Sequence, residues 1–272
     1  MFPRTRIGDL GGVIVLAIMS TLAAFWALSA QADPYRDGRF SFDISVTSDS
    51  DVAKSVLGNL LIQDIADGVK PTVTRWPDVP CYTAIASDDA SLRQLHDLLS
   101  ALNNRLGLKI EACTSGSSSA ITYYFGHGQI GSDEKRIILE LVRPVQEDNA
   151  HLSSFLHQQT SCYWHAHTEN VDGRLNITKA SVLVDLQAMD AGQMARCLFA
   201  GTAGSLGLTQ VVPAHQESAP VNWGAVVETD LLSLFVLYHL KDEYVAGDRQ
   251  DITTATEEII SAMHEMGKQG SP

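Results

Sequence analysis

Positive charge is scarce in this chain. There are 19 Lys and Arg side chains against 32 Asp and Glu, which gives a formal net charge of −13 at neutral pH. Nucleic acids and anionic membrane surfaces attract proteins through clustered Lys and Arg. The composition therefore excludes both as main partners and favours an acidic chain that stays in solution.

Closely spaced cysteines are also lacking. The four cysteines are Cys81, Cys113, Cys162 and Cys197, and no two of them lie within four residues of each other. This spacing excludes a Cys-x-x-Cys redox motif and a zinc ribbon. In an exported chain, an even number of cysteines indicates structural disulfides, and four cysteines allow three pairings.

Only one long apolar run is present, from Gly11 to Leu28. Arg4 and Arg6 precede it, and Ala30 and Ala32 follow at the small-residue positions that a signal peptidase reads. We expect a secretory signal peptide cut after Ala32, and a periplasmic or secreted protein. An uncut membrane anchor is the alternative, because the run is close to the lower limit of about 17–25 residues for a membrane span.

Removal of residues 1–32 leaves a mature chain with 17 basic and 31 acidic side chains. Its first part, 33–50, is polar and is expected to be flexible. Residues 51–267 are long enough to bury one sizeable core, so we predict a single domain followed by a short tail, 268–272. No second apolar run reaches the length of a membrane span.

Apolar residues recur at helical spacing in several segments. The clearest helix starts after Asp88 and ends before Gly107, which is placed to close it. Its apolar stripe consists of Leu92, Leu95, Leu99, Leu102 and Leu106. Other helices are expected at 51–66, at two places within 131–160 (the second at 148–158), and at 190–206, 229–240 and 252–266.

Strands are expected at 73–76, 81–86, 108–113, 121–125 and 175–186, with weaker alternation over 162–167. Strands separated by a helix favour parallel pairing, so the sequence predicts an α+β fold with a mixed sheet. Cys81 and Cys113 then lie on two early strands, while Cys162 lies near a strand and Cys197 on the next helix. We therefore expect Cys81 to pair with Cys113 and Cys162 with Cys197.

Residues 194–209, "MARCLFAGTAGSLGLT", resemble the helix of a zinc peptidase that lacks its zinc ligands and its catalytic glutamate. Such a helix carries two histidines four residues apart and a glutamate beside the first. Alignment on the Leu-Gly-Leu ending at 206–208 places Ala200, Gly201 and Gly204 at those positions. None of them can ligate a metal or move a proton, so zinc-dependent hydrolysis at this helix is excluded and no cofactor is expected. A simpler explanation for these small residues is that a helix face without bulky side chains can pack closely against a neighbouring element.

The strand at 175–186 followed by this helix is similar to the arrangement in zincin-type peptidases. The chain also resembles an exported bacterial family of unknown function (domain of unknown function 2927). The matching segments are "RCLFAGTAGSLGL", Asn222-Trp223, "ETDLLSLFVLYH" and "RWPDVPCY". The resemblance spans residues 50–265 and implies export and a zincin-like architecture, with no established activity. We therefore expect a non-catalytic protein with a binding or structural role in the cell envelope and an unknown protein or envelope partner.

A serine hydrolase is a first alternative. Residues 203–207, Ala-Gly-Ser-Leu-Gly, are a variant of the nucleophile elbow, a sharp strand-to-helix turn that would expose Ser205. Asp230 and His239 follow in the chain order that an α/β-hydrolase uses. The predicted helix at this position does not fit the strand that an elbow requires.

A metal-binding protein is a second alternative. His165 and His167 lie two residues apart, so on a strand both imidazoles would share one face and could meet one metal ion. His127 or His157 could complete the site in space. Surface or hydrogen-bonded histidines are the competing explanation for the pair.

Overall fold

The computed structural model describes residues 49–61, 73–86, 88–114, 120–145, 149–172, 174–209, 223–245 and 249–269. All of them belong to one compact unit within residues 40–272. The expected signal peptide at 1–32, nearly all of the expected flexible segment at 33–50 and the end of the expected tail lie outside the described residues.

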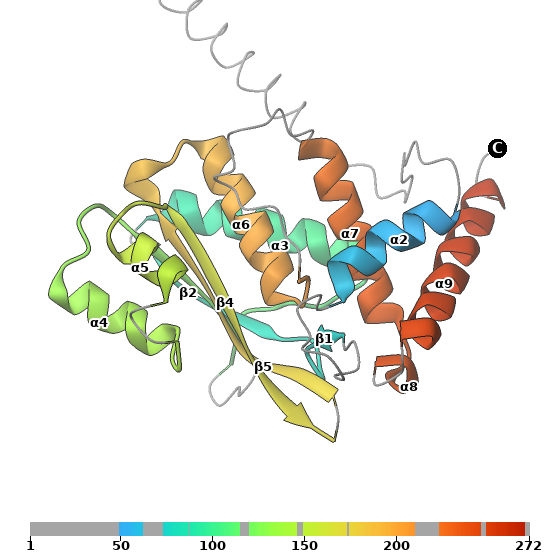
Figure 1. Ribbon diagram of the computed structural model, residues 1–272. Coiled ribbons are helices and arrows are strands. Elements are labelled where there is room, and N and C mark those ends of the chain that lie inside the picture. The colour runs from blue at the N-terminus through green and yellow to red at the C-terminus, as the bar shows by residue number, and fades with distance from the viewer. Residues whose placement is uncertain are drawn as a thin grey trace, which may run out of the picture. The chain divides into compact units, whose positions relative to one another are not determined.

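A mixed sheet forms the centre of the α+β fold (Figure 1). Its strands are β1 (Thr74–Arg75), β2 (Cys81–Ile85), β3 (Ala120–Gly126), β4 (Cys162–Val171) and β5 (Arg174–Asp185). β2, β3 and β5 are neighbours and run parallel, and β1 pairs in parallel with the start of β5. β4 pairs with β5 in the antiparallel direction. The predicted parallel pairing is thus confirmed.

Strand β5 is the most deeply buried strand. Val182, Leu183 and Val184 are fully buried near its carboxyl end, where helices cover both sheet faces. Apolar, largely β-branched runs of this kind are typical of strands enclosed on both sides. Figure 1 shows α4 and α5 on one side of the sheet and α6 and α3 on the other.

One sheet face is covered by α6 (Ala191–Ser205), which contacts β4 and β5. Further out lie α3 (Asp89–Leu106), α7 (Trp223–His239), α2 (Asp49–Leu60) and α9 (Arg249–Gln269). These helices bury their apolar faces against each other, and α7 is apolar over most of its length, as expected of an enclosed helix.

The opposite face is covered by α4 (Ser132–Leu141) and α5 (Ala150–Leu156). Their core, shared with the sheet, consists of Tyr124, Ile138, Val142, Leu152, Phe155, Tyr163 and Leu183. Two short elements, η1 (Leu186–Ala188) and α8 (Asp242–Val245), follow β5 and α7.

The strand predicted at 108–113 is wrong. In the described residues only an isolated bridge joins Ala112 to Tyr82: the Tyr82 amide donates to the Glu111 carbonyl and the Cys113 amide donates to the Tyr82 carbonyl, each at 2.8 Å. Asn103 Nδ2 donates to the Ile110 carbonyl at 3.0 Å, and the Ile110 amide donates to Asn103 Oδ1 at 2.9 Å. On the β2 side, Pro80 lies two residues before Tyr82 and has no N–H to extend the pairing, so the ladder of a full strand does not form.

Two helix details also differ from the sequence predictions. Leu92 is 39% exposed, because Ser91 takes the buried position in the first turn of α3. Thr229 does not begin α7, which starts at Trp223; the Thr229 carbonyl accepts from the Ser233 hydroxyl inside the helix. The sequence pattern thus predicted both helices, but it assigned Leu92 to the buried face of α3 and placed the start of α7 too late in the chain.

Two disulfides join the predicted cysteine pairs. Cys81 pairs with Cys113 with a Cα separation of 4.9 Å, and Cys162 pairs with Cys197 with a Cα separation of 5.8 Å. The second disulfide fastens β4 to α6. Disulfides persist in oxidising compartments, so both bonds indicate a location outside the reducing cytosol. Among the described helices, none has both the length and the apolar character needed to cross a bilayer.

Candidate functional site

Helix α6 begins with a capping box that fixes its start. The Gln193 amide donates to Asp190 Oδ1 at 2.7 Å, and the Asp190 amide donates to Gln193 Oε1 at 2.8 Å. These bonds satisfy donors that a helix start leaves free. From Leu198 to Ser205 the helix is buried, and it crosses β4 and β5.

The three positions aligned with zincin ligands lie in this buried stretch, and side chains of the sheet fill the space beside two of them. A β-carbon on Gly201 would lie 2.6 Å from Val182 Cγ1, and one on Gly204 would collide with the Trp164 indole nitrogen. Ala200 is also buried. Close contact with β4 and β5 therefore accounts for the glycines at these two positions, as the simpler explanation predicts.

The Leu-Gly-Leu ending has a structural cause of its own. Gly207 has a φ of +117°, and a β-carbon there would collide with the Thr74 carbonyl oxygen on β1. The Tyr238 hydroxyl donates to the Leu206 carbonyl at 3.0 Å. Glycine is needed because the chain leaves α6 in a conformation that other residues rarely adopt, against a neighbouring strand.

Ser205 does not lie on a nucleophile elbow. It is the last residue of α6, fully buried, and its hydroxyl has no hydrogen-bond partner in the described part of the chain. Its carbonyl accepts from Trp76 Nε1 at 2.7 Å, and Trp76 lies in the core. A helix instead of a strand precedes Ser205, so the exposed nucleophile of an α/β-hydrolase is absent here.

The other two residues of the hypothetical triad also lie apart. Asp230 is buried on α7 and accepts from Asn59 Nδ2 at 2.9 Å; burial raises its pKa to about 7, and the Asn59 bond opposes that shift. His239 is exposed, stacks on Phe235 and bonds through Nδ1 to the Phe235 carbonyl at 2.8 Å. His239 follows Asp230 by nine positions on the same helix, a rise of about 13.5 Å along the axis.

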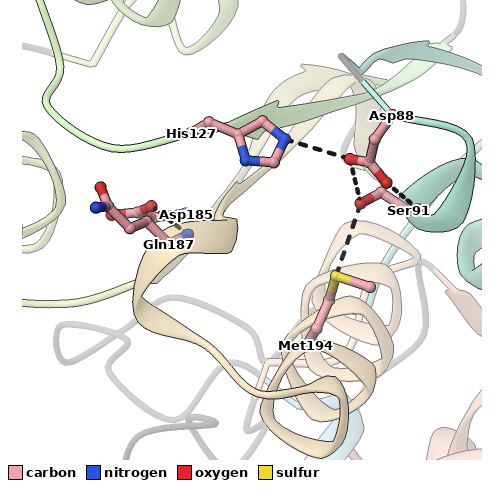
Figure 2. A network of polar contacts seen from close by, with 6 residues as sticks. All are labelled: Asp88, Ser91, His127, Asp185, Gln187 and Met194. Carbon is pink, nitrogen blue, oxygen red and sulfur yellow. Dashed lines mark hydrogen bonds and ion pairs between the residues drawn. The ribbon is translucent and has the colours of Figure 1, made fainter.

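A polar network lies at the carboxyl ends of β2 and β3 (Figure 2). Asp88 caps α3: its Oδ1 accepts from the Ser91 amide at 2.8 Å and its Oδ2 from the Ser91 hydroxyl at 2.9 Å. The same Oδ2 lies 3.3 Å from His127 Nε2. These contacts, chiefly the Ser91 amide bond, lower the pKa of Asp88. The Ser91 hydroxyl is buried and donates to the carboxylate that caps the helix, so its contacts hold the first turn of α3 in place.

Asp185 ends β5 and forms a separate contact. Its Oδ1 accepts from the Gln187 amide at 3.0 Å, and Figure 2 shows this pair apart from the chain of contacts around Asp88. Met194 closes the network on the other side, with its sulfur 4.0 Å from the Ser91 hydroxyl. The network thus fastens the first turn of α3 to the end of β3 and to α6.

An open groove of about 500 Å³ lies beside β4. Its lining includes Pro144, Val145, Asn149, His165, His167 and Thr168. His165 and His167 share the face of β4 that is turned away from α6, as the two-residue spacing predicts, because Cys162 and Trp164 face α6. The sequence identified this histidine pair but not the groove.

Two residues that the sequence analysis did not single out complete the surroundings of the groove. Lys179 lies opposite His167 in the ladder, and its Nζ donates to the Glu140 carbonyl at 3.1 Å. Asn149 caps α5 by accepting from the amides of His151 and Leu152, each at 3.1 Å. The position of Lys179 beside His167 follows from the antiparallel register of β4 and β5, which the sequence alone does not give.

The electrostatics of His165 follow from this setting. Burial, and then the neighbouring His167 and Lys179, lower its pKa, so the ring is neutral at pH 7. Its Nε2 is buried and has no hydrogen-bond partner among the residues that the structure describes. His167 Nε2 lies 3.6 Å from Glu169 Oε1, and both side chains are partly exposed.

No group of three or more His, Cys, Asp or Glu side chains in the described residues could hold a metal ion. His127 pairs with Asp88, and His157 bonds to the Ser153 carbonyl at 2.8 Å. The structure therefore brings His165 and His167 to one face but adds no third ligand from these candidates. Asn222 and the Trp223 side chain lie outside the described part.

Comparison of the chain with protein-family models, with curated proteins and with solved structures finds no match. The resemblance to zincins and to the exported family therefore rests on the sequence segments that suggested it.

Proposed function

We propose that this protein is an exported, non-catalytic binding protein of zincin-like architecture that works in the cell envelope. The observation that carries the proposal is the packing of α6: Val182 and Trp164 fill the face on which a zincin would hold its metal. Ala200, Gly201 and Gly204 carry no side chain that could ligate a metal, so this helix is suited to support the sheet.

The order of elements supports the architecture. An antiparallel strand, β4, precedes β5, and the helix that follows β5 is α6. This agrees with the strand-then-helix order on which the resemblance to zincins depends. The disulfides support export, because a chain stapled at Cys81–Cys113 and Cys162–Cys197 needs an oxidising compartment to form them.

A binding role is favoured over a purely structural one by the groove beside β4. It is open, and imidazole and amide groups line it. Specific binding sites combine a concave surface with a few polar groups that fix orientation. The groove beside β4 meets that description.

The proposal is tested on the mature chain starting at residue 33, purified from an oxidising compartment. Metal analysis after dialysis should find no stoichiometric zinc, and casein and model ester substrates should remain intact. A fluorophosphonate probe should leave Ser205 unlabelled, and a Ser205→Ala variant purified in parallel identifies hydrolysis that comes from a contaminant. Stoichiometric metal, or hydrolysis lost in that variant, would overturn the proposal.

Export is tested separately. In cells that make the full chain, the mass of the accumulated protein should correspond to a first residue at Asp33. Accumulation of the full-length chain in the membrane fraction would instead establish the uncut anchor.

A further inference from the structure

We propose that ionisation of Asp230 loosens the packing of α2 against α7, so that α2 detaches locally more often as the pH rises. The inference concerns a conformational response built into the fold and is independent of the proposed binding role. Its basis is a buried carboxyl group on α7 whose hydrogen bond, among the described residues, goes to Asn59 on α2.

Asp230 lies where α7 meets α2. Its side chain is buried, with 3% of the residue exposed, and its Oδ1 accepts from Asn59 Nδ2 at 2.9 Å. Its Oδ2 is also buried and has no hydrogen-bond partner in the part of the chain that the structure describes. A carboxylate can accept about four hydrogen bonds, so one amide donor leaves the ionised form poorly satisfied. The site therefore favours the protonated carboxyl group, and burial raises the pKa of Asp230 to about 7.

Charged groups on the neighbouring helices do not offset this burial. On α3, Arg105 pairs with Glu228 at 3.2 Å, and the other charged side chains of that helix are exposed. On α2, Lys54 pairs with Asp51 at the surface. The charged side chains described on α9 are all exposed: Arg249, Asp251, Glu257 and Glu258. The raised pKa of Asp230 accordingly comes from burial, opposed by the Asn59 bond.

Helix α2 is the element that can move to admit water. It packs mainly on α7 and α9, whereas α7 also contacts α3 and is enclosed among these helices (Figure 1). Asn59 is the polar joint of this packing: its Nδ2 also donates to Ser233 Oγ at 3.2 Å, and its carbonyl accepts from the Thr209 amide at 2.8 Å. Elements at the border of a fold open at a lower free-energy cost than its central strands. Detachment of α2 therefore exposes Asp230 without global unfolding.

The direction of the response follows from the two protonation states. In the closed state the pKa of Asp230 is about 7, and in the open state the hydrated carboxyl group returns to its ordinary value of 3.8. The closed state thus keeps a proton that the open state loses, and a rising pH favours opening until the pH exceeds about 7. Between pH 6 and pH 8 the ratio of open to closed molecules should rise about tenfold.

The test is hydrogen exchange of the intact mature protein at pH 6 and pH 8, read by mass spectrometry of its peptides and corrected for the intrinsic exchange rate at each pH. Peptides from α2 should be less protected than peptides from β5 at both pH values. Protection of α2 should fall about tenfold between pH 6 and pH 8 in the wild type and stay constant in Asp230→Asn. Glu257→Gln removes an exposed carboxylate from α9 and is the matched control, which should keep the wild-type change.

A second variant, Asn59→Ala, removes the joint without changing the carboxyl group. It should lower the protection of α2 at pH 6 by at least about fivefold, because a buried hydrogen bond is lost. If Asp230→Asn does not fold, this variant and the wild-type comparison decide.

Three results would overturn the inference. Equal exchange rates in α2 and β5 would mean that Asp230 is exposed by global unfolding alone. Constant protection of α2 in the wild type would mean that its ionisation does not act on this helix, and so would the same loss of protection in Asp230→Asn. The non-catalytic proposal is decided separately, by the metal and hydrolysis measurements.

Discussion

The indole nitrogen of Trp164 occupies the space in which a β-carbon on Gly204 would lie. Strand β4 and helix α6 approach so closely at this point that only hydrogen fits on the helix. Three consequences of the packing around α6 and α7, and one of the disulfide beside it, can be measured as changes in the free energy of unfolding.

Gly204→Ala should destabilise the protein. The added methyl group forces Trp164 or the helix to move, and overpacking of this kind costs about 1–3 kcal/mol. Urea unfolding measures the change. Gly58→Ala is the matched control, because a β-carbon on Gly58 in α2 meets nothing within 4 Å and should stabilise the helix by up to about 1 kcal/mol. Equal effects of the two variants would contradict the close approach.

Loss of the Cys162–Cys197 disulfide should lower the free energy of unfolding by about 2–4 kcal/mol, because the bond constrains the unfolded chain. The double variant Cys162→Ala with Cys197→Ala removes it without burying new polar groups. Denaturant unfolding gives the size of the loss. Non-reducing peptide mapping of the wild-type protein provides the check, and crossed cysteine pairs there would refute the connectivity.

Asp230 should make stability depend on pH. Its pKa is raised by burial from the ordinary 3.8 to about 7, so the folded state favours the protonated form. The resulting stabilisation is complete below pH 3.8 and is lost as the pH rises to about 7, a loss of a few kcal/mol.

The variant Asp230→Asn should abolish this loss and be more stable than the wild type at pH 8, since it buries no charge. Thermal unfolding between pH 4 and pH 8 measures the slope. Asp97→Asn, at an exposed position on α3, is the control and should keep the wild-type pH profile. A pH profile of Asp230→Asn that matches the wild type would contradict the burial argument.

Arg75 should stabilise the end of α7. Its Nη1 donates to the carbonyls of Leu240 at 2.7 Å and Leu237 at 3.3 Å. Carbonyls at a helix end lack the amide partners that the helix interior supplies. The Nη2 of Arg75 pairs with Asp242. Because this side chain is only 14% exposed, Arg75→Ala should cost about 1–3 kcal/mol.

Arg174→Ala provides the matched control for Arg75, since Arg174 contacts the same Asp242 at 3.5 Å but is 39% exposed. Its removal should cost less than about 1 kcal/mol. If unfolding measurements gave the two arginine variants the same stability, the contact with the helix end would contribute nothing.

Local signals in the sequence were sufficient for several elements. Asp88 and Gly107 bound α3, and Asp190 caps α6, because capping depends on residues within one turn. The strand expected at 108–113 failed for the opposite reason. Its pairing with β2 is limited to Tyr82, because Pro80 has no N–H to extend the ladder, and the local pattern of 108–113 does not show which segment it would pair with.

By itself, the sequence determined the acidic character of the chain, its even set of cysteines and the absence of zinc ligands at Ala200, Gly201 and Gly204. These follow from residue identity and short-range spacing alone. Only the tertiary structure decided that Val182 and Trp164 fill the face of α6 and that Lys179 lies beside the histidines of β4. Such contacts join residues far apart in the chain, and they exist only once strands have paired in register and the helix has packed on them.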